Sequence, residues 1–196
     1  YNVGVTWSSS CGDWLRHFSI SADGYYNTVK DKIVALPTMY VWKMMNMGEV
    51  DIKGVDVNLS TQFRLPLRMS LLLASTYSFQ YAVDVTDPEA KNYKDQIPYT
   101  PRHSGTVSVT VENPWVNVSY ILTAVGDRYA LPQNIDRNRI DSYIEQSISI
   151  NRDFRFRYFG LRLQGELLNL ANVNYDVIQY YPMPGRSWRL SICLSY

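Results

Sequence analysis

A strict alternation of apolar and polar residues governs the end of this 196-residue chain. One side of the alternation is apolar throughout and is formed by Trp188, Leu190, Ile192, Leu194 and Tyr196. The residues between them are an arginine, a cysteine and two serines. Because successive side chains of a β-strand point to opposite faces, this pattern predicts a strand with one apolar face and one polar face.

The same alternation recurs in eight earlier segments, so the sequence predicts nine strands. They cover approximately residues 3–7, 18–26, 55–63, 71–81, 106–111, 116–122, 140–150, 159–170 and 188–196. Extended to the neighbouring turn residues, most of them are about 9–13 residues long, whereas a strand of a soluble sheet has roughly 5–6. A tilted strand that crosses a bilayer needs about 9–11 residues. Strand length therefore favours a membrane protein that crosses with strands.

The connections between the predicted strands alternate between short and long. The short ones are residues 8–14, 64–67, 112–115 and 151–157, and the long ones are residues 28–47, 84–102, 129–139 and 172–184. Outer-membrane barrels show this asymmetry, with tight periplasmic turns and long outer loops. We therefore predict an all-β fold for residues 1–196, an antiparallel up-and-down transmembrane β-barrel with a periplasmic C-terminus.

Aromatic residues agree with this orientation. The chain has 16 Tyr, 5 Trp and 6 Phe, and barrels place such rings in girdles at the two membrane interfaces. The predicted periplasmic girdle consists of Trp7, Phe18, Phe63, Phe159 and Tyr196, and the opposite rim carries Tyr26, Tyr81 and Trp188.

An odd number of strands cannot close an up-and-down barrel, because the first and last strands would then run parallel. Unpaired strand edges in hydrocarbon are costly, since no water is present to satisfy their backbone groups. We therefore expect this chain to be part of a larger barrel.

Other classes of function have little support in the sequence. The net charge of +1 gives no basic surface for nucleic acid. The sequence shows no nucleophile with a nearby base, no paired carboxylates and no glycine-rich phosphate loop. It therefore gives no support for an enzyme, a cofactor or a metal site. His17 and His103 are interpreted as hydrogen-bonded residues at strand ends, and Cys11 and Cys193 as free thiols.

Specific segments, beyond the alternation, resemble a known family. Residues 21–27, 48–56, 93–103 and 181–189 are similar, in order and spacing, to the C-terminal half of the barrel of TonB-dependent outer-membrane receptors. The resemblance implies a 22-stranded barrel in a Gram-negative outer membrane, of which this chain would supply the last nine strands. It also implies a plug domain and a TonB-contacting segment, both expected outside this chain.

The resemblance further implies import of a scarce ligand. Pro184, Gly185 and Arg186 are more similar to the siderophore, cobalamin and haem receptors than to the starch-utilisation branch of glycan or peptide importers. Expected partners are outer-membrane lipids, TonB, the imported ligand and, in some relatives, a surface lipoprotein. The sequence does not identify the ligand. A passive porin-like channel is the main alternative, and a soluble or adhesive β-protein or a barrel lipase fits less well.

Two groups of side chains are candidates for function. Thioethers and aromatic rings make adaptable apolar contacts, so the outer loop 36–47 is a predicted ligand-binding segment. Its candidate residues are Met39, Tyr40, Trp42, Met44, Met45 and Met47. The polar faces carry charges of both signs that would suit a lumen filled by a polar plug: Asp23, Asp56, Glu145, Arg162, Glu166 and Arg189. We also expect Gly54 to allow a close backbone approach and Arg186 to pair with a lumenal carboxylate.

Overall fold

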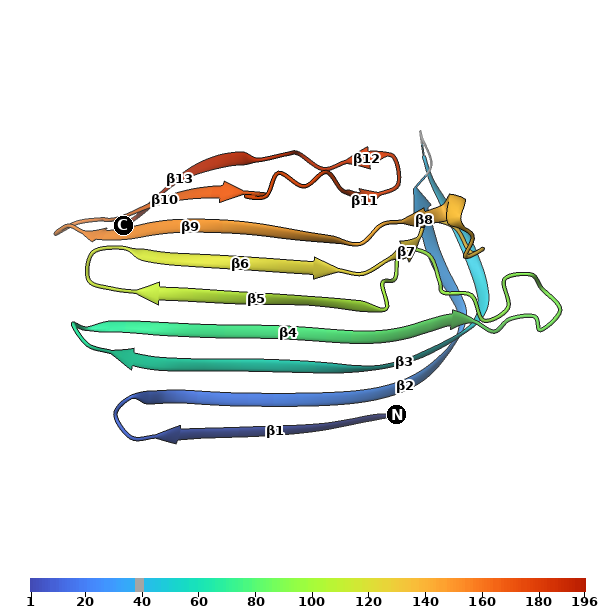
Figure 1. Cartoon of the computed structure of the whole chain (residues 1–196), viewed down its shortest axis with the longest axis horizontal. Coiled ribbons are helices and arrows are strands. Elements are labelled where there is room, and N and C mark those ends of the chain that lie inside the picture. The colour runs from blue at the N-terminus through green and yellow to red at the C-terminus, as the bar shows by residue number, and fades with distance from the viewer. Residues whose placement is uncertain (38–40) are drawn as a thin grey trace.

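Nine strands form one antiparallel sheet and follow one another in chain order (Figure 1). This computed structural model describes residues 1–37 and 41–196. The strands are β1 (Asn2–Cys11), β2 (Leu15–Pro37), β3 (Trp42–Leu65), β4 (Met69–Asp84), β5 (His103–Glu112), β6 (Asn117–Val125), β9 (Tyr143–Arg155), β10 (Gly160–Leu168) and β13 (Ser187–Ser195). The predicted all-β architecture and the nine alternating segments are confirmed.

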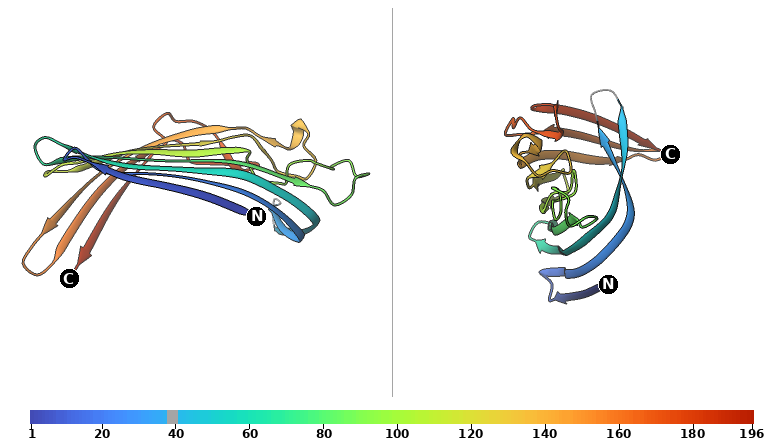
Figure 2. Two further views of the ribbon diagram at one scale, coloured as in Figure 1. Left: turned by 90° about the horizontal axis from the view of Figure 1, so that it is seen from below. Right: turned by 90° about the vertical axis from the view of Figure 1, so that its right-hand side faces the viewer.

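The sheet is strongly curved and open. Figure 2 shows it bending into an arc whose two ends are β1 and β13, and these two edges do not pair with each other. No helix in the described ranges is long and apolar enough to cross a membrane.

Short and long connections lie at opposite ends of the sheet (Figure 1). Tight turns join β1 to β2, β3 to β4, β5 to β6 and β9 to β10 at one end. The long segments at the other end carry the short elements β7 (Arg128–Tyr129), η1 (Asp136–Asn138), β8 (Arg139–Ile140), β11 (Asp176–Ile178) and β12 (Tyr181–Pro182). Ile140 pairs with Arg128 in the small β7–β8 sheet, so the strand predicted over 140–150 begins only at Tyr143.

The described residues of the predicted outer loop 28–47 lie mostly in paired strands, which corrects the sequence prediction. β2 and β3 continue to pair with each other as far as Pro37 and Trp42. β1 ends its pairing with β2 at Tyr25, and β4 pairs with β3 only from Val50. Residues 30–37 and 42–49 therefore form a two-stranded projection, here called the β2–β3 ribbon, which crosses the open side of the arc (Figures 1 and 2). Its β-branched residues favour strands, although the methionine run obscures the alternation.

The strand register separates an apolar face from a polar face. Directly paired residues share a face, and Ile20 is paired with Leu59 while the adjacent Ser21 is paired with Asn58. The apolar face is uncovered, because Leu190, Ile192 and Leu194 on β13 are 64%, 65% and 65% exposed. The only sizeable buried cluster of the described residues joins Met47, Val50, Ala82 and Ile97 at the base of the ribbon. A large uncovered apolar face indicates a surface made to meet lipid or protein.

Gly54 shows why a small residue is needed between two strands. It is paired with Tyr25 on β2, and a Cβ atom at this position would lie 2.4 Å from the carbonyl oxygen of Phe79 and 2.6 Å from Cζ of Tyr25. The tyrosine ring therefore occupies the space that a side chain would take, and the predicted close approach is confirmed.

Candidate functional site

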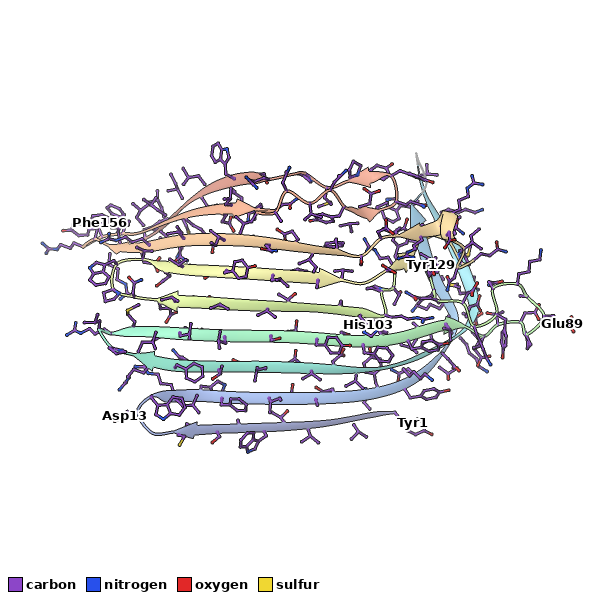
Figure 3. All side chains as sticks on the ribbon, in the orientation of Figure 1. Tyr1, Asp13, Glu89, His103, Tyr129 and Phe156 are labelled. Atoms are coloured by element: carbon purple, nitrogen blue, oxygen red, sulfur yellow. The ribbon has the colours of Figure 1, made fainter. Side chains whose placement is uncertain are left out.

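Three long segments at one end of the sheet are joined to one another by hydrogen bonds. Residues 85–102, 126–142 and 169–186 form this group, here called the outer layer. Tyr99 N donates to Tyr129 O at 2.8 Å, and Asn134 N donates to Asp95 Oδ2 at 3.1 Å. Gln179 Nε2 donates to Arg137 O at 3.1 Å. The three segments are thus a connected layer, within which Figure 3 labels Glu89 and Tyr129.

Arg128 is a buried residue that connects two segments of this layer. Its side chain is only 3% exposed, and its Nη2 donates to the carbonyl oxygens of Asp176 at 2.6 Å and Val177 at 3.1 Å. Its guanidinium carbon also lies 5.5 Å from the centroid of the Tyr143 ring. Burial lowers the pKa of Arg128, while Tyr143, Tyr99 and Asp176 oppose that change. The group stays charged at neutral pH and holds residues 169–186 against β7.

Two tyrosines complete the surroundings of Arg128. Tyr143 stacks on Tyr175 with ring centroids 4.1 Å apart. Burial raises the pKa of the Tyr99 phenol above its ordinary value of 10.0, opposed by a hydrogen bond to the backbone of Gln179 and by the charge of Arg128. Sequence reasoning missed Arg128, because a single arginine in a mixed-charge segment has no distinguishing pattern.

Asp84 fixes the start of residues 85–102. Its Oδ1 accepts from Thr86 N at 3.0 Å and from Thr86 Oγ1 at 2.6 Å, and its Oδ2 accepts from Asn92 Nδ2 at 2.7 Å. Lys94 N donates to the backbone oxygen of Asp84 at 2.8 Å. One buried carboxylate at the end of β4 therefore folds the following segment back onto the sheet.

Of the small cavities at this end, one is bounded by residues 137–142 and another by the β2–β3 ribbon. The first, of about 370 Å³, is bounded by Arg137, Arg139 and Tyr175 among others; Arg139 is itself bonded to Asp127 at 2.7 Å. The second, of about 240 Å³, lies between the β2–β3 ribbon and residues 84–93, with Met45 and Tyr93 in its wall. Drug-sized ligands occupy pockets of about 300–1,000 Å³, so the volume of the first cavity lies at the low end of this range and that of the second lies below it.

The ribbon divides the predicted ligand-binding residues into separate groups. Trp42 and Met44 are 60% and 66% exposed and, being two residues apart, share one face. Met45 is half-buried on the opposite face, and Met47 is 3% exposed in the buried cluster. Met39 and Tyr40 lie outside the described residues. The structure therefore leaves Trp42 and Met44 open to a partner, whereas Met47 has a packing role.

The register places the six predicted charged residues on the polar face. Asp23 pairs with Asp56, Glu145 pairs with Thr123, and Glu166 pairs with Arg189. The Arg189 guanidinium bonds to Glu166. Arg162 binds Asp153 through Nε at 2.6 Å and Nη2 at 3.1 Å, a partner that sequence reasoning did not select because Asp153 falls within a predicted turn.

Two of the other charges of this group, Asp56 and Glu145, accept hydrogen bonds from uncharged partners. Asp56 accepts from Ser78 Oγ at 2.5 Å, and Glu145 accepts from Asn169 N at 3.0 Å. The expected pairing of Arg186 with a carboxylate is wrong. Its Nε and Nη2 donate instead to the carbonyl oxygen of Leu170 at 3.0 and 2.6 Å, because residues 169–186 fold back beside the start of β13.

His103 behaves as a structural residue at the start of β5 (labelled in Figure 3). Its Nδ1 is 2.8 Å from the Tyr77 hydroxyl, and its ring lies 5.1 Å from that of Phe79. In the part of the chain that the structure describes, no group of three or more His, Cys, Asp or Glu side chains could hold a metal ion. Cys11 and Cys193 are free and exposed.

Long antiparallel strands with one uncovered apolar face, short turns at one end and a layered set of segments at the other define the wall of a membrane-type β-barrel. The chain belongs to the family of TonB dependent receptor-like β-barrels, whose model matches residues 1–170. No curated protein matches the sequence.

Solved structures with the same fold include iron receptors. The ferric preacinetobactin receptor BauA of Acinetobacter baumannii has a TM-score of 0.69 and 11% identity, with 100% of this chain and 29% of that chain covered. The ferric-catecholate import receptor Fiu of E. coli K12 has a TM-score of 0.68 and 15% identity, covering 99% and 27%. The FrpB iron transporter of Neisseria meningitidis has a TM-score of 0.62 and 17% identity, covering 99% and 30%. The chain thus spans less than a third of these proteins.

Proposed function

We propose that the protein carrying this chain is an outer-membrane receptor that binds a ferric siderophore and imports it by a TonB-dependent route. The observation that carries the proposal is the family match over residues 1–170, together with matching solved structures whose names describe ferric-siderophore or iron transport. In this proposal the nine strands belong to the C-terminal part of a 22-stranded barrel, and the tight turns face the periplasm.

The two faces of the sheet support a transmembrane wall. Residues such as Leu190 and Ile192 have no covering layer, and a lipid-facing barrel surface needs such an apolar band. We assign the opposite face to the lumen, where Arg162–Asp153 and Arg189–Glu166 provide ion pairs within the wall. Because these charges are already paired, a plug domain can slide past them without leaving a buried charge unpartnered.

The outer layer and the β2–β3 ribbon are the proposed first contact with the ligand. Residues 30–49, 85–102, 126–142 and 169–186 carry ten lysines and arginines against nine aspartates and glutamates. Ligand charge therefore has little influence on capture by this part of the protein, and apolar and aromatic contacts have more. Trp42 and Met44, which are exposed on the β2–β3 ribbon, offer such contacts.

Equilibrium binding to the full-length receptor tests this proposal. The purified protein is titrated with ferric catecholate, ferric hydroxamate, cobalamin and haem, and quenching of tryptophan fluorescence is measured. We expect saturable binding of at least one ferric siderophore, with weaker binding of the iron-free chelator. Binding of cobalamin or haem alone would contradict the siderophore assignment while leaving the receptor class intact.

The passive-channel alternative is tested by uptake. A porin-like channel passes its solute without energy coupling, whereas the proposed importer depends on TonB. Uptake of the bound ligand in cells with and without TonB therefore separates the two classes.

A further inference from the structure

A single charged residue lies on the apolar face of β9, β10 and β13 among the residues paired in these strands. Arg152 is paired with Leu163 of β10, and Leu163 is paired with Ile192 of β13. Its neighbours on the same face of β9 are Ile150 and Phe154. The arginine therefore projects from a surface that is otherwise made of apolar side chains.

The position of Arg152 along the strand is close to the short-turn end. The β6–β9 pairing stops at Asn117 and Asn151, one residue before it. Beyond it come the rings of Phe156 and Phe159, which stack with centroids 4.6 Å apart, and Figure 3 labels Phe156 at this tip. Arginine on a lipid face is costly at mid-membrane and tolerated near the interface, and aromatic rings favour the interface. Both features place Arg152 near the level of the lipid headgroups.

The guanidinium of Arg152 lacks an acidic partner among the described residues. Its guanidinium carbon makes a cation–π contact with Phe154, at 4.8 Å from the centroid of the ring. Arg162, on the polar face of the adjacent strand, is held by Asp153. A second cation of this hairpin, Arg157, lies 5.4 Å from the exposed Tyr158 ring in the turn. Two arginines without carboxylate partners thus lie beside interfacial aromatic rings.

We infer that Arg152 and Arg157 bind the phosphate of an anionic phospholipid in the periplasmic leaflet. The planar guanidinium presents paired donors that match phosphate oxygens, and the flanking rings can contact the glycerol and upper acyl region. Arg152 would approach from the barrel wall and Arg157 from the turn below it. The inference rests on the proposed function only for the placement of these strands in the outer membrane.

The test uses the full-length receptor in nanodiscs that contain phosphatidylethanolamine and a variable share of phosphatidylglycerol. Native mass spectrometry counts the phosphatidylglycerol retained after release from the disc. The test variants are Arg152→Gln, Arg157→Gln and the double variant. A further variant, Arg152→Lys, keeps the positive charge but lacks the planar guanidinium with its paired donors. The matched control is Arg155→Gln, which removes one positive charge from the same hairpin on the polar face, where Arg155 pairs with Gly160.

We expect the wild-type receptor to retain phosphatidylglycerol in preference to phosphatidylethanolamine. Each Gln substitution should reduce that preference about fivefold, the effect of one arginine at an anionic membrane surface. Arg152→Lys should give an intermediate loss and Arg155→Gln none. Equal retention by the wild type and the double variant, with the fold verified by circular dichroism, would overturn the inference, as would an equal loss in Arg155→Gln.

The experiment distinguishes an error in the proposed membrane location from an error in the proposed lipid site. A receptor that stays soluble without detergent and does not enter nanodiscs would contradict the proposed function itself. A receptor that enters nanodiscs, stays folded and shows no preference for phosphatidylglycerol would contradict only the lipid site.

Discussion

Replacing Arg128 is expected to release residues 169–186 from the outer layer while leaving the sheet intact. Its Nη2 makes two hydrogen bonds to the carbonyl oxygens of Asp176 and Val177. Hydrogen bonds from a charged group contribute about 1.5–3 kcal/mol each. Part of this gain offsets the cost of burying a cation whose Nη1 has no partner among the described residues. We therefore expect Arg128→Met to weaken the attachment by about 2–3 kcal/mol.

Hydrogen exchange of the full-length receptor measures this loss directly. A change of about 2–3 kcal/mol raises the opening equilibrium of the attached segment about 30- to 150-fold. The faster exchange should be confined to residues 169–186 and the neighbouring β7–β8 pair, whereas β9 and β10 should keep their protection. Arg128→Lys keeps the charge but lacks the planar guanidinium with its paired donors. Exchange of residues 169–186 in this variant should be intermediate between the wild type and Arg128→Met. Unchanged exchange of residues 169–186 in Arg128→Met would refute the assigned role.

Three further predictions concern other parts of the chain. Gly54→Val should lower the free energy of unfolding by about 1–3 kcal/mol in a urea titration, because the added atoms collide with Phe79 O and the Tyr25 ring; unchanged stability would contradict that packing. The double variant Trp42→Ser, Met44→Ser should weaken ligand binding without a change in the free energy of unfolding, whereas Met47→Ala should lower that free energy by about 2–5 kcal/mol. A destabilised double variant, or a Met47→Ala variant of unchanged stability, would contradict the assignment of Trp42 and Met44 to binding and of Met47 to packing. Because burial raises the pKa of Tyr99, the folded outer layer holds the phenol proton more tightly than the unfolded chain does. The stability that Tyr99 contributes is therefore complete below pH 10 and lost as the pH rises further, a change that proteolysis at increasing pH should detect and that Tyr99→Phe should remove.

The regular part of the fold was predictable because its physical cause is local. An alternation such as that from Trp188 to Tyr196 determines which side chains share a face, and tight turns then determine which strands are neighbours. The register between β2 and β3 follows from the same rule, since a slip of one residue would move Leu59 to the polar face. Strand order and the short-turn end could therefore be read from the sequence.

The outer segments were less predictable because their structure depends on contacts between distant residues. Arg128 acquires its role only when residues 176 and 177 fold over it, and the sequence around it shows no periodic pattern. Asp153 was missed for a related reason, since it continues β9 beyond the predicted end of the strand. The methionine-rich stretch of the β2–β3 ribbon departs from a clean alternation and therefore predicts a loop. The two strands nevertheless pair with each other without a third neighbour.

Energised uptake by whole cells tests the central claim most directly. Cells that lack their own receptors are given the full-length protein, and accumulation of radioactive iron from the ferric siderophore that binds best is followed with and without TonB. We predict saturable uptake that disappears when TonB is removed, while binding at the cell surface remains. Equal uptake in the two strains, or no binding of any ferric siderophore by the folded receptor, would contradict the account.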